Sequence, residues 1–318
     1  MNDPSRKDDL LNLPLAKAPD SIWTSIEVAM DVGAEAKRVS RPVAGSWILM
    51  WGFAASTIVL VVAVLVWLSV RLPKTTWAVV RVDGKPSVGS KPMGDSGRIA
   101  VGEWLQTDAS SRARIAVGDI GTVDVAPNSR VQVLASRPQE QRIRLARGEI
   151  SASVTAPPRL FFVDTPASTA VDLGCAYTMK ADPDGNGLLR VTLGWVSLEW
   201  EGRESLVPAG ASCWTRPKVG PGTPYFDDAP QGLVSALSNF DFGGGGVPAL
   251  DTVLGEARVR DTLTLWHLLS RVDPAQRERV FDRMAGLVPQ PKEVSRDRAL
   301  QLDRATLQRW REELAWRW

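Results

Sequence analysis

The sequence predicts a membrane-anchored protein with one transmembrane helix, an all-β domain of stacked β-layers (solenoid-like or sandwich-like) and a small C-terminal α-helical domain. Three observations predict this class. Residues 46–70 contain no charged side chain, residues 71–215 carry short runs of alternating apolar and polar residues, and residues 249–318 carry apolar residues at helical spacing. The first pattern is typical of a membrane span, the second of half-buried strands and the third of amphipathic helices.

The uncharged stretch runs from Ser46 to Val70 and holds 25 residues. At about 1.5 Å per residue, a helix of this length reaches roughly 37 Å, which is enough to cross a hydrocarbon core about 30 Å thick. Trp47, Trp51 and Trp67 lie near its two ends, where indole rings favour the lipid–water boundary. A buried core helix is the alternative, and the complete absence of charge favours a span. A signal peptide is disfavoured because the run is too long and begins after residue 45.

Residues 1–45 precede this span and are too few to bury a core of their own. One amphipathic helix is predicted there, starting after the sequence Pro19-Asp20-Ser21 and ending at Gly33. Its apolar face consists of Ile22, Trp23, Ile26 and Met30. Such a face either docks a partner protein or rests on the lipid surface, and the residues alone leave both interpretations open.

Residues 71–215 form the predicted β domain, in which runs such as RARIAV (112–117) and LRVTL (189–193) alternate with turn residues. A weak internal repeat accompanies these runs, because Gly102, Gly148 and Gly194 are each 46 residues apart. If this repeat is not a chance pattern, it indicates stacked β-layers in which each layer buries the apolar face of the next.

Residues 216–248 are rich in Pro and Gly and are predicted to be a linker. From residue 249 to residue 318 the spacing of apolar residues predicts helices, with the first one running past Leu250 and Leu269. Asp273 before Pro274 predicts the start of a second helix, and Asp303 predicts the start of the last. These helices are expected to form a small core.

The composition argues against several classes of function. The chain has one histidine, His267, and two cysteines, so a histidine-based catalytic triad or a metal site of several histidines is not expected. A net charge of +2 gives no strong attraction to nucleic acid. The acidic run from Asp182 to Gly187 resembles the start of a calcium loop, but its position 12 is Leu193, so a hairpin turn is predicted. We expect no enzyme activity, catalytic residue, metal or cofactor.

The β region resembles the periplasmic domain of the FecR family of transmembrane regulators. The resemblance rests on ordered motifs, including glycine turns, a V-x-T-P sequence and a closing Ala-Gly turn. These motifs lie in VGEWLQTDASSRARIAVGDIGTVDVAPNSRV (101–131), LARGEISASV (145–154), FFVDTPASTAVDLGCAYTM (161–179), VTLGWVSLE (191–199) and LVPAGASC (206–213). The chain departs from the family pattern at two positions, with Cys175 in place of Thr and Tyr177 in place of Phe.

The resemblance implies a single-pass regulator of the bacterial inner membrane. Residues 1–45 would be cytoplasmic and hold an extracytoplasmic-function sigma factor, and residues 71–318 would be periplasmic and receive a signal from a periplasmic or outer-membrane protein. The numbers of Lys and Arg on the two sides of the span do not decide this orientation. The alternative is an envelope structural or interaction protein that keeps the FecR-like β domain without sigma binding.

Both cysteines, Cys175 and Cys213, follow the span, and each follows a glycine turn of the proposed repeat. If neighbouring layers bring these turns together in an oxidising compartment, a disulfide is expected between them. The loop that it closes would stabilise the fold by roughly 3 to 4 kcal/mol. The alternative is that both act as small buried apolar residues.

Overall fold

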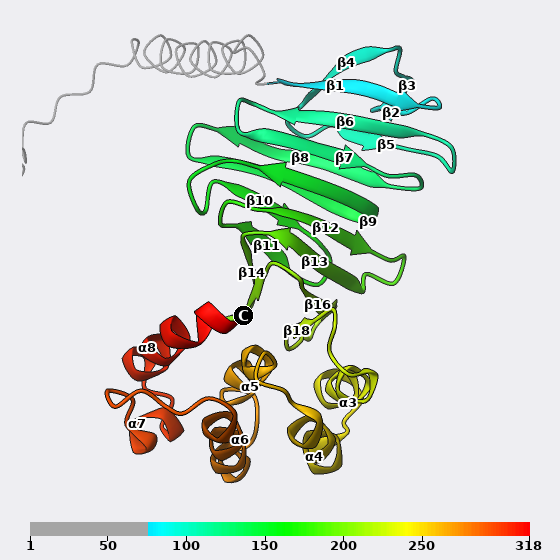
Figure 1. Ribbon diagram of the computed structural model, residues 1–318. Helices are drawn as coiled ribbons and strands as arrows, with labels where there is room; N and C mark the ends of the chain where they lie inside the picture. Colours follow the sequence, from blue (N-terminus) through cyan, green and yellow to red (C-terminus); the bar gives the residue numbers. More distant parts are fainter. Residues whose placement is uncertain (1–75) are drawn as a thin grey trace, which may run out of the picture. The chain divides into compact units, whose positions relative to one another are not determined.

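The structure is a computed structural model that describes residues 76–318, so the predicted transmembrane segment and the residues before it lie outside the described part. The described residues contain eighteen strands followed by six α-helices and one 3₁₀ helix (Figure 1). The predicted order of a β-rich part followed by a helical part is therefore confirmed. No helix within residues 76–318 is both long and apolar enough to cross a membrane.

The strands form two sheets. Sheet A contains, in spatial order, β4 (Ser96–Ala100), β1 (Thr76–Asp83), β6 (Arg112–Val117), β7 (Gly121–Val125), the second half of β9 (Glu140–Val154), β12 (Ala176–Ala181), β13 (Gly187–Leu193) and β16 (Ala211–Arg216), to which β17 (Gly220–Pro221) and β18 (Tyr225–Phe226) both pair. Sheet B contains β3 (Lys91–Pro92), β2 (Ser87–Val88), β5 (Trp104–Gln106), β8 (Arg130–Arg137), the first half of β9, β10 (Phe161–Asp164), β11 (Thr169–Asp172), β14 (Trp195–Trp200) and β15 (Arg203–Pro208).

Strand β9 belongs to both sheets. Its first half pairs with β8 and β10 in sheet B, and its second half pairs with β7 and β12 in sheet A. The pairing of β9 with β10 is parallel, and every other strand pairing within residues 76–318 is antiparallel. Consecutive hairpins lie next to one another along the stack, as Figure 1 shows from β4 to β16.

The inner faces of the two sheets share one apolar core. Strand β6 shows the pattern clearly, because Ala113, Ile115 and Val117 are buried while Arg112 and Arg114 are exposed. The same alternation in the other strands gives a continuous cluster that includes Val79, Leu105, Ile143, Phe161, Met179, Leu198 and Phe226. The arrangement agrees with the sandwich-like alternative, in which alternate side chains of each strand meet those of the facing sheet.

The three glycines that are spaced 46 residues apart do not mark identical layers. Gly102 joins sheet A to sheet B, Gly148 lies where β9 passes from sheet B to sheet A, and Gly194 again joins sheet A to sheet B. All three have positive φ, with values of 92°, 93° and 73°. The repeat therefore marks places where the chain crosses between sheets and needs a left-handed backbone.

Residues 216–248 do not form the linker that the Pro and Gly content predicts. The seven residues from Gly220 to Phe226 are all buried, and β17 and β18 pair with β16. At Gly220, with a φ of +83°, a Cβ atom would lie 2.8 Å from Trp200 Cδ1. The Pro and Gly residues thus allow a close approach to β14, and the helical part begins directly after this segment.

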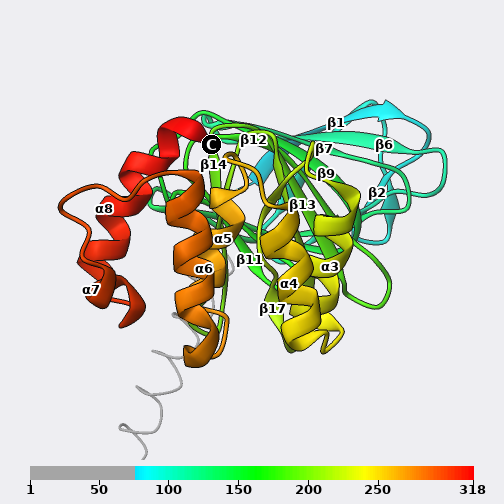
Figure 2. The same cartoon turned by 60° about the horizontal axis from the view of Figure 1, so that its bottom comes forward.

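The helical part consists of α3 (Gln231–Phe242), α4 (Gly246–Glu256), α5 (Thr262–Leu268), α6 (Pro274–Leu287), α7 (Arg296–Leu300), α8 (Arg304–Leu314) and the 3₁₀ helix η2 (Ala315–Arg317). Figure 2 shows α3, α4, α5 and α6 side by side. They enclose a second apolar core that includes Leu237, Leu250, Leu268, Phe281 and Trp310. The single helix predicted through Leu250 and Leu269 is two helices, α4 and α5, with a break between them.

Two turn predictions are confirmed by local contacts. The Asp303 side chain accepts a hydrogen bond from the Thr306 backbone N–H at 3.0 Å and caps α8. The segment from Asp182 to Gly187 is the hairpin turn between β12 and β13, in which Asp182 accepts a hydrogen bond from the Asn186 backbone N–H at 2.8 Å.

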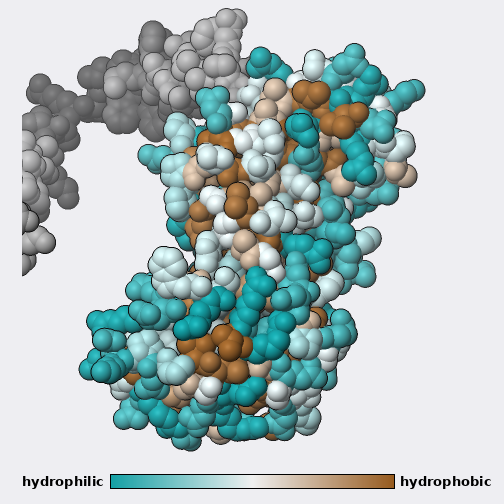
Figure 3. All heavy atoms as spheres, viewed as in Figure 1, coloured by the Kyte–Doolittle hydropathy of each residue, from teal (hydrophilic) through white to brown (hydrophobic). Residues whose placement is uncertain are grey.

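The outer surface of the helical part is mostly hydrophilic in the view of Figure 3.

Candidate functional site

The predicted partner-binding residues Ile22, Trp23, Ile26 and Met30 lie outside the residues that the structure describes. Within residues 76–318, a group of buried polar side chains lies where the β part meets the helical part. A second feature of chemical interest is the pair of cysteines.

The disulfide predicted between Cys175 and Cys213 is not formed, and both thiols are free and buried. The Cys175 thiol donates a hydrogen bond to Asp172 Oδ2 at 2.8 Å, and the Cys213 thiol donates one to the Gly222 carbonyl at 3.1 Å. Each sulfur therefore has a different partner.

Strand order explains why the two cysteines do not meet. Strand β13 lies between β12 and β16, since its Leu189 pairs with Met179 on one side and Cys213 on the other. Two strand spacings separate Cys213 from β12 by about 10 Å, and Cys175 lies four residues before Met179. A disulfide needs Cα atoms within about 7 Å.

Burial also makes both thiols poor nucleophiles. Burial, followed by the neighbouring Asp172 carboxylate, raises the pKa of the Cys175 thiol well above its usual range. Burial raises the pKa of Cys213 to about 12. Both side chains are protonated at neutral pH, and only a thiolate reacts readily.

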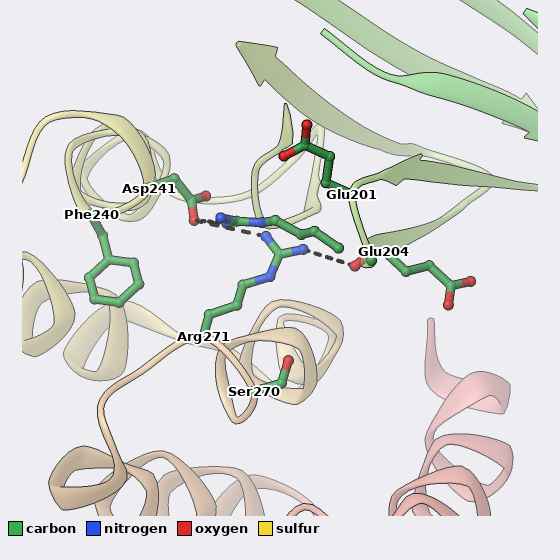
Figure 4. A pocket seen from close by; sticks show the side chains of 8 residues that line it. Glu201, Glu204, Phe240, Asp241, Ser270 and Arg271 are labelled. Atoms are coloured by element: carbon green, nitrogen blue, oxygen red, sulfur yellow. Dashed lines mark hydrogen bonds and ion pairs between the residues drawn. The ribbon is translucent and has the colours of Figure 1, made fainter. Parts of the chain in front are cut away.

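The polar site at the junction contains a pocket of about 570 Å³ (Figure 4). Its walls come from the β14–β15 turn and β15, from the end of α3, and from the residues after α5. The lining residues are Glu201, Gly202, Arg203, Glu204, Phe240, Asp241, Ser270 and Arg271. Elements that are distant in sequence therefore meet at one place.

Arg271 is the central side chain of this site and is only 7% exposed. Its guanidinium donates hydrogen bonds to the Glu204 carbonyl at 3.0 Å, to Ser205 Oγ at 2.7 Å and to Thr223 Oγ1 at 2.9 Å. Figure 4 shows it reaching from the helical part between Asp241 and the backbone of Glu204. This one side chain ties the helical part to β15 and to the buried segment after β17.

Asp241, 3% exposed, supplies the negative charge of the site. Its carboxylate accepts hydrogen bonds from the Thr223 backbone N–H at 2.6 Å and from Arg203 Nη2 at 3.3 Å, and it lies 3.8 Å from Arg271 Nη1. Burial lowers the pKa of Arg271 to about 10, while the Asp241 carboxylate acts in the opposite direction. Arg271 therefore remains charged at neutral pH, in a buried ion pair with Asp241 whose two members are each hydrogen-bonded to other groups.

His267 closes the edge of β15 beside this pocket. Its Nδ1 lies 2.9 Å from the Leu263 carbonyl, and its Nε2 lies 3.0 Å from the Leu206 backbone nitrogen. Because a carbonyl only accepts, Nδ1 carries the proton and Nε2 accepts the Leu206 N–H, so the ring is neutral. Burial lowers the pKa of His267 to about 3, and Arg271 acts in the same direction.

The chemistry of the junction is that of a structural polar cluster. Both ring nitrogens of His267 are hydrogen-bonded, and neither thiol is ionised, so these groups do not form a nucleophile–base pair. Within residues 76–318, no group of three or more His, Cys, Asp or Glu side chains is arranged to hold a metal ion. What the arrangement does is hold two parts of the chain together.

Comparison with known proteins identifies the β part. The sequence matches the family described as "FecR protein" over residues 103–196. Residues 103–196 are a FecR domain. The resemblance predicted from the motifs is thereby confirmed, and the FecR domain runs from just before β5 into β14. A search of curated proteins gives no significant match.

Two solved structures show a partial likeness to the chain. Both are crystal structures of a "putative anti-sigma factor" from Parabacteroides distasonis, with 14% sequence identity and a TM-score of 0.34. Each match covers 42% of this chain, and the chain spans 63% and 62% of the length of the two matched chains. The likeness to the FecR family therefore rests on the sequence match over residues 103–196.

The junction residues Asp241, His267 and Arg271 were not among the site residues that the sequence predicts. Their partners lie far away in the sequence, such as Leu206, which is 61 residues from His267. One signal was present, since Arg271 and His267 flank the apolar pair Leu268 and Leu269 in a region predicted to be a helix core. A charged or titratable residue within such a core needs a buried partner.

Proposed function

We propose that this protein is a single-pass regulator of the bacterial inner membrane that holds an extracytoplasmic-function sigma factor and releases it in response to a periplasmic signal. The observation that supports the proposal is the FecR domain at residues 103–196, which follows the 25 uncharged residues of the predicted span. Regulators of this kind place a cytoplasmic segment before the span and a β-rich receiving domain after it.

In this proposal, residues 1–45 are cytoplasmic and residues 71–318 are periplasmic. The apolar face of Ile22, Trp23, Ile26 and Met30 binds the sigma factor, and a periplasmic or outer-membrane protein contacts the FecR domain. The protein works by shifting a binding equilibrium between held and free sigma factor, with no chemical step. It needs neither a cofactor nor a catalytic residue.

Sigma binding is tested by co-purifying the full chain with the extracytoplasmic-function sigma factor encoded nearest to its gene. We expect Trp23→Ala to weaken the complex at least about tenfold, because buried aromatic side chains dominate such interfaces. Trp316→Ala is the matched control, since Trp316 is 91% exposed in the helical part. Absence of any complex with the unchanged protein would instead favour an envelope structural or interaction protein.

Orientation is tested separately with reporters fused after Trp318. An enzyme reporter that is active only in the periplasm should give signal, and one that is active only in the cytoplasm should not. The reverse result would contradict both the orientation and the sigma-factor proposal.

A further inference from the structure

The outer face of sheet B carries an ordered array of side chains from β5, β8 and β9. Residues that lie opposite each other in antiparallel strands share a face. The register places Trp104 opposite Gln132 and Gln132 opposite Arg144, and it places Gln106 opposite Arg130. Beyond a bulge at Arg130 and Val131, Arg130 lies opposite Arg147, and both Arg144 and Arg147 are exposed. The alternate positions, such as Leu105, Val131 and Leu145, are buried in the core. Trp104 and the three arginines, which we name the arginine patch, therefore lie on one outer surface of the FecR domain.

The positive charge of the arginine patch is not neutralised within residues 76–318. Arg130, Arg144 and Arg147 form no ion pair with any described carboxylate, whereas most other arginines of the β part do. Arg130 and Arg147 are directly opposite each other, and like charges in that position destabilise a sheet. Repulsion between these two arginines therefore lowers the stability of the sheet at this surface.

Two acidic side chains that neighbour the patch by register or by sequence have other partners. Asp164 is the register partner of Arg144 in β10, but its carboxylate accepts hydrogen bonds from Arg142 Nη1 at 2.7 Å and from Thr169 Oγ1 at 2.9 Å. Glu103 accepts a hydrogen bond from the Ala100 backbone N–H at 2.9 Å. Neither carboxylate hydrogen-bonds to the three arginines of the patch.

Arg130 is held in a fixed orientation by an aromatic ring. Its Cζ lies 4.1 Å from the centroid of the Trp104 ring, so the guanidinium is stacked on the indole. Its Nε is buried and has no hydrogen-bond partner within the described residues. A planar guanidinium held in this way is preorganised to form two parallel hydrogen bonds with a carboxylate.

We propose that the arginine patch binds an acidic segment of a partner protein. Carboxylates match the forked donors of arginine, and Trp and Arg are enriched in the centres of protein interfaces. The patch extends over three strands, or about 10 Å, which matches acidic side chains at alternate positions of an extended segment. The inference extends the proposed function, on which the periplasmic location of that partner rests.

The test measures binding of a short labelled peptide, in which Glu alternates with Ser, to purified residues 73–318. This fragment is a compact unit that contains both apolar cores. We expect binding that weakens with salt, is absent for the peptide with Gln in place of Glu, and falls at least about tenfold in the double variant Arg144→Glu/Arg147→Glu. The double variant Lys292→Glu/Arg298→Glu, which makes the same charge change on exposed positions of the helical part, should keep its affinity.

Several outcomes would overturn the inference. Unchanged affinity in the patch variant, or equal loss in both variants, would show that the patch is not the binding surface. Heparin or phosphatidylglycerol vesicles binding the same arginines more tightly than the peptide would assign the surface to a glycan or a lipid. Full affinity in Arg144→Lys/Arg147→Lys would show that the peptide is held by positive charge alone and not by paired hydrogen bonds from arginine to carboxylate. An unchanged midpoint of urea unfolding confirms that each variant folds. Sigma binding is assayed on the full chain through Trp23, so failure of one proposal does not imply failure of the other.

Discussion

The two ends of the strand stack are finished in different ways. At the C-terminal end, the last strand of sheet B, β15, has its outer edge covered by α5 and the residues after it. His267 accepts the Leu206 N–H, Arg271 donates to the Glu204 carbonyl, and Pro208, the next residue with the same orientation, has no N–H. At the N-terminal end, no strand within residues 76–318 pairs with the outer edges of β4 and β3.

This difference shows two solutions to one physical problem. An edge strand exposes unpaired N–H and C=O groups that can pair with another chain. The C-terminal end satisfies them with side chains from a helix, which makes the helical part a cap of the FecR-containing sandwich. The N-terminal end relies on short strands with Lys91, Pro92 and Arg98, which are features that discourage pairing. Stability should therefore be concentrated at the capped end.

The largest effect is expected from Arg271→Met, which removes the central contact of the cap. Asp241 would keep its contacts with Arg203 and Thr223 but lose its more deeply buried cation, and the carbonyl of Glu204 would lose its donor. Breaking a buried ion pair at one side typically costs about 3 to 5 kcal/mol. The free energy of unfolding of residues 73–318 in urea should fall by this amount.

Arg298→Met is the matched control for this change, because Arg298 is exposed on α7. It should alter the free energy of unfolding by less than about 0.5 kcal/mol. Equal effects of the two substitutions would contradict the idea that the junction cluster holds the cap in place.

The second prediction concerns pH and His267. Its pKa is lowered to about 3 in the folded protein, against about 6.5 when unfolded, so the unfolded chain binds more protons between these values. The free energy of unfolding should therefore fall as pH decreases from about 6.5 to about 3, by up to about 1.4 kcal/mol per pH unit from this group. Urea unfolding of the wild type and His267→Gln at pH 7 and pH 4 measures the difference. If the free energies of unfolding of the two proteins changed with pH in the same way, the pKa of His267 would not be lowered by burial in the cap.

The smallest effect is a difference in amide hydrogen exchange between the two ends. The Leu206 amide of β15 should exchange slowly, because His267 accepts its hydrogen bond. Residues 96–99 of β4 should exchange at least about tenfold faster, since the outer edge of this strand has no strand partner within the described residues. Ala100 is left out because its N–H donates to Glu103. In Arg271→Met, protection of β15 should fall toward that of β4. Retained protection of β15 would mean that apolar contacts alone close this edge.

Much of the β part could be predicted from the sequence because its signals are local. Alternation in runs such as Arg112–Val117 indicated the strands, and the ordered glycine turns indicated the resemblance to the FecR family. Helix starts at Asp273 and Asp303 were also readable from local sequence. The Asp303 side chain caps its helix, whereas Asp273 makes no capping hydrogen bond and its helix starts at Pro274. The 46-residue spacing was real as a pattern of sheet crossings, but its meaning depended on which sheet each strand joins.

The failures share a physical cause, which is contact between distant residues. The segment Gly220–Phe226 has the composition of a linker, yet it is buried because Gly220 packs against the Trp200 ring. The predicted disulfide between Cys175 and Cys213 does not form, because β13 lies between β12, which Cys175 directly precedes, and β16, which contains Cys213. Neither result can be read from composition or spacing, since both depend on strand order.

The cap also has a consequence for how the chain matures during synthesis. Ser205 on β15 and Arg271 are 66 residues apart, so the edge is finished well before its cover exists. At about 5 to 20 residues per second, this interval lasts roughly 3 to 13 seconds. During that time β15 is an open edge strand, and Pro208 is the one position of its outer edge that cannot donate to a neighbouring nascent chain. Newly made molecules therefore pass through a brief period in which they can pair wrongly, and the docking of α5 ends it.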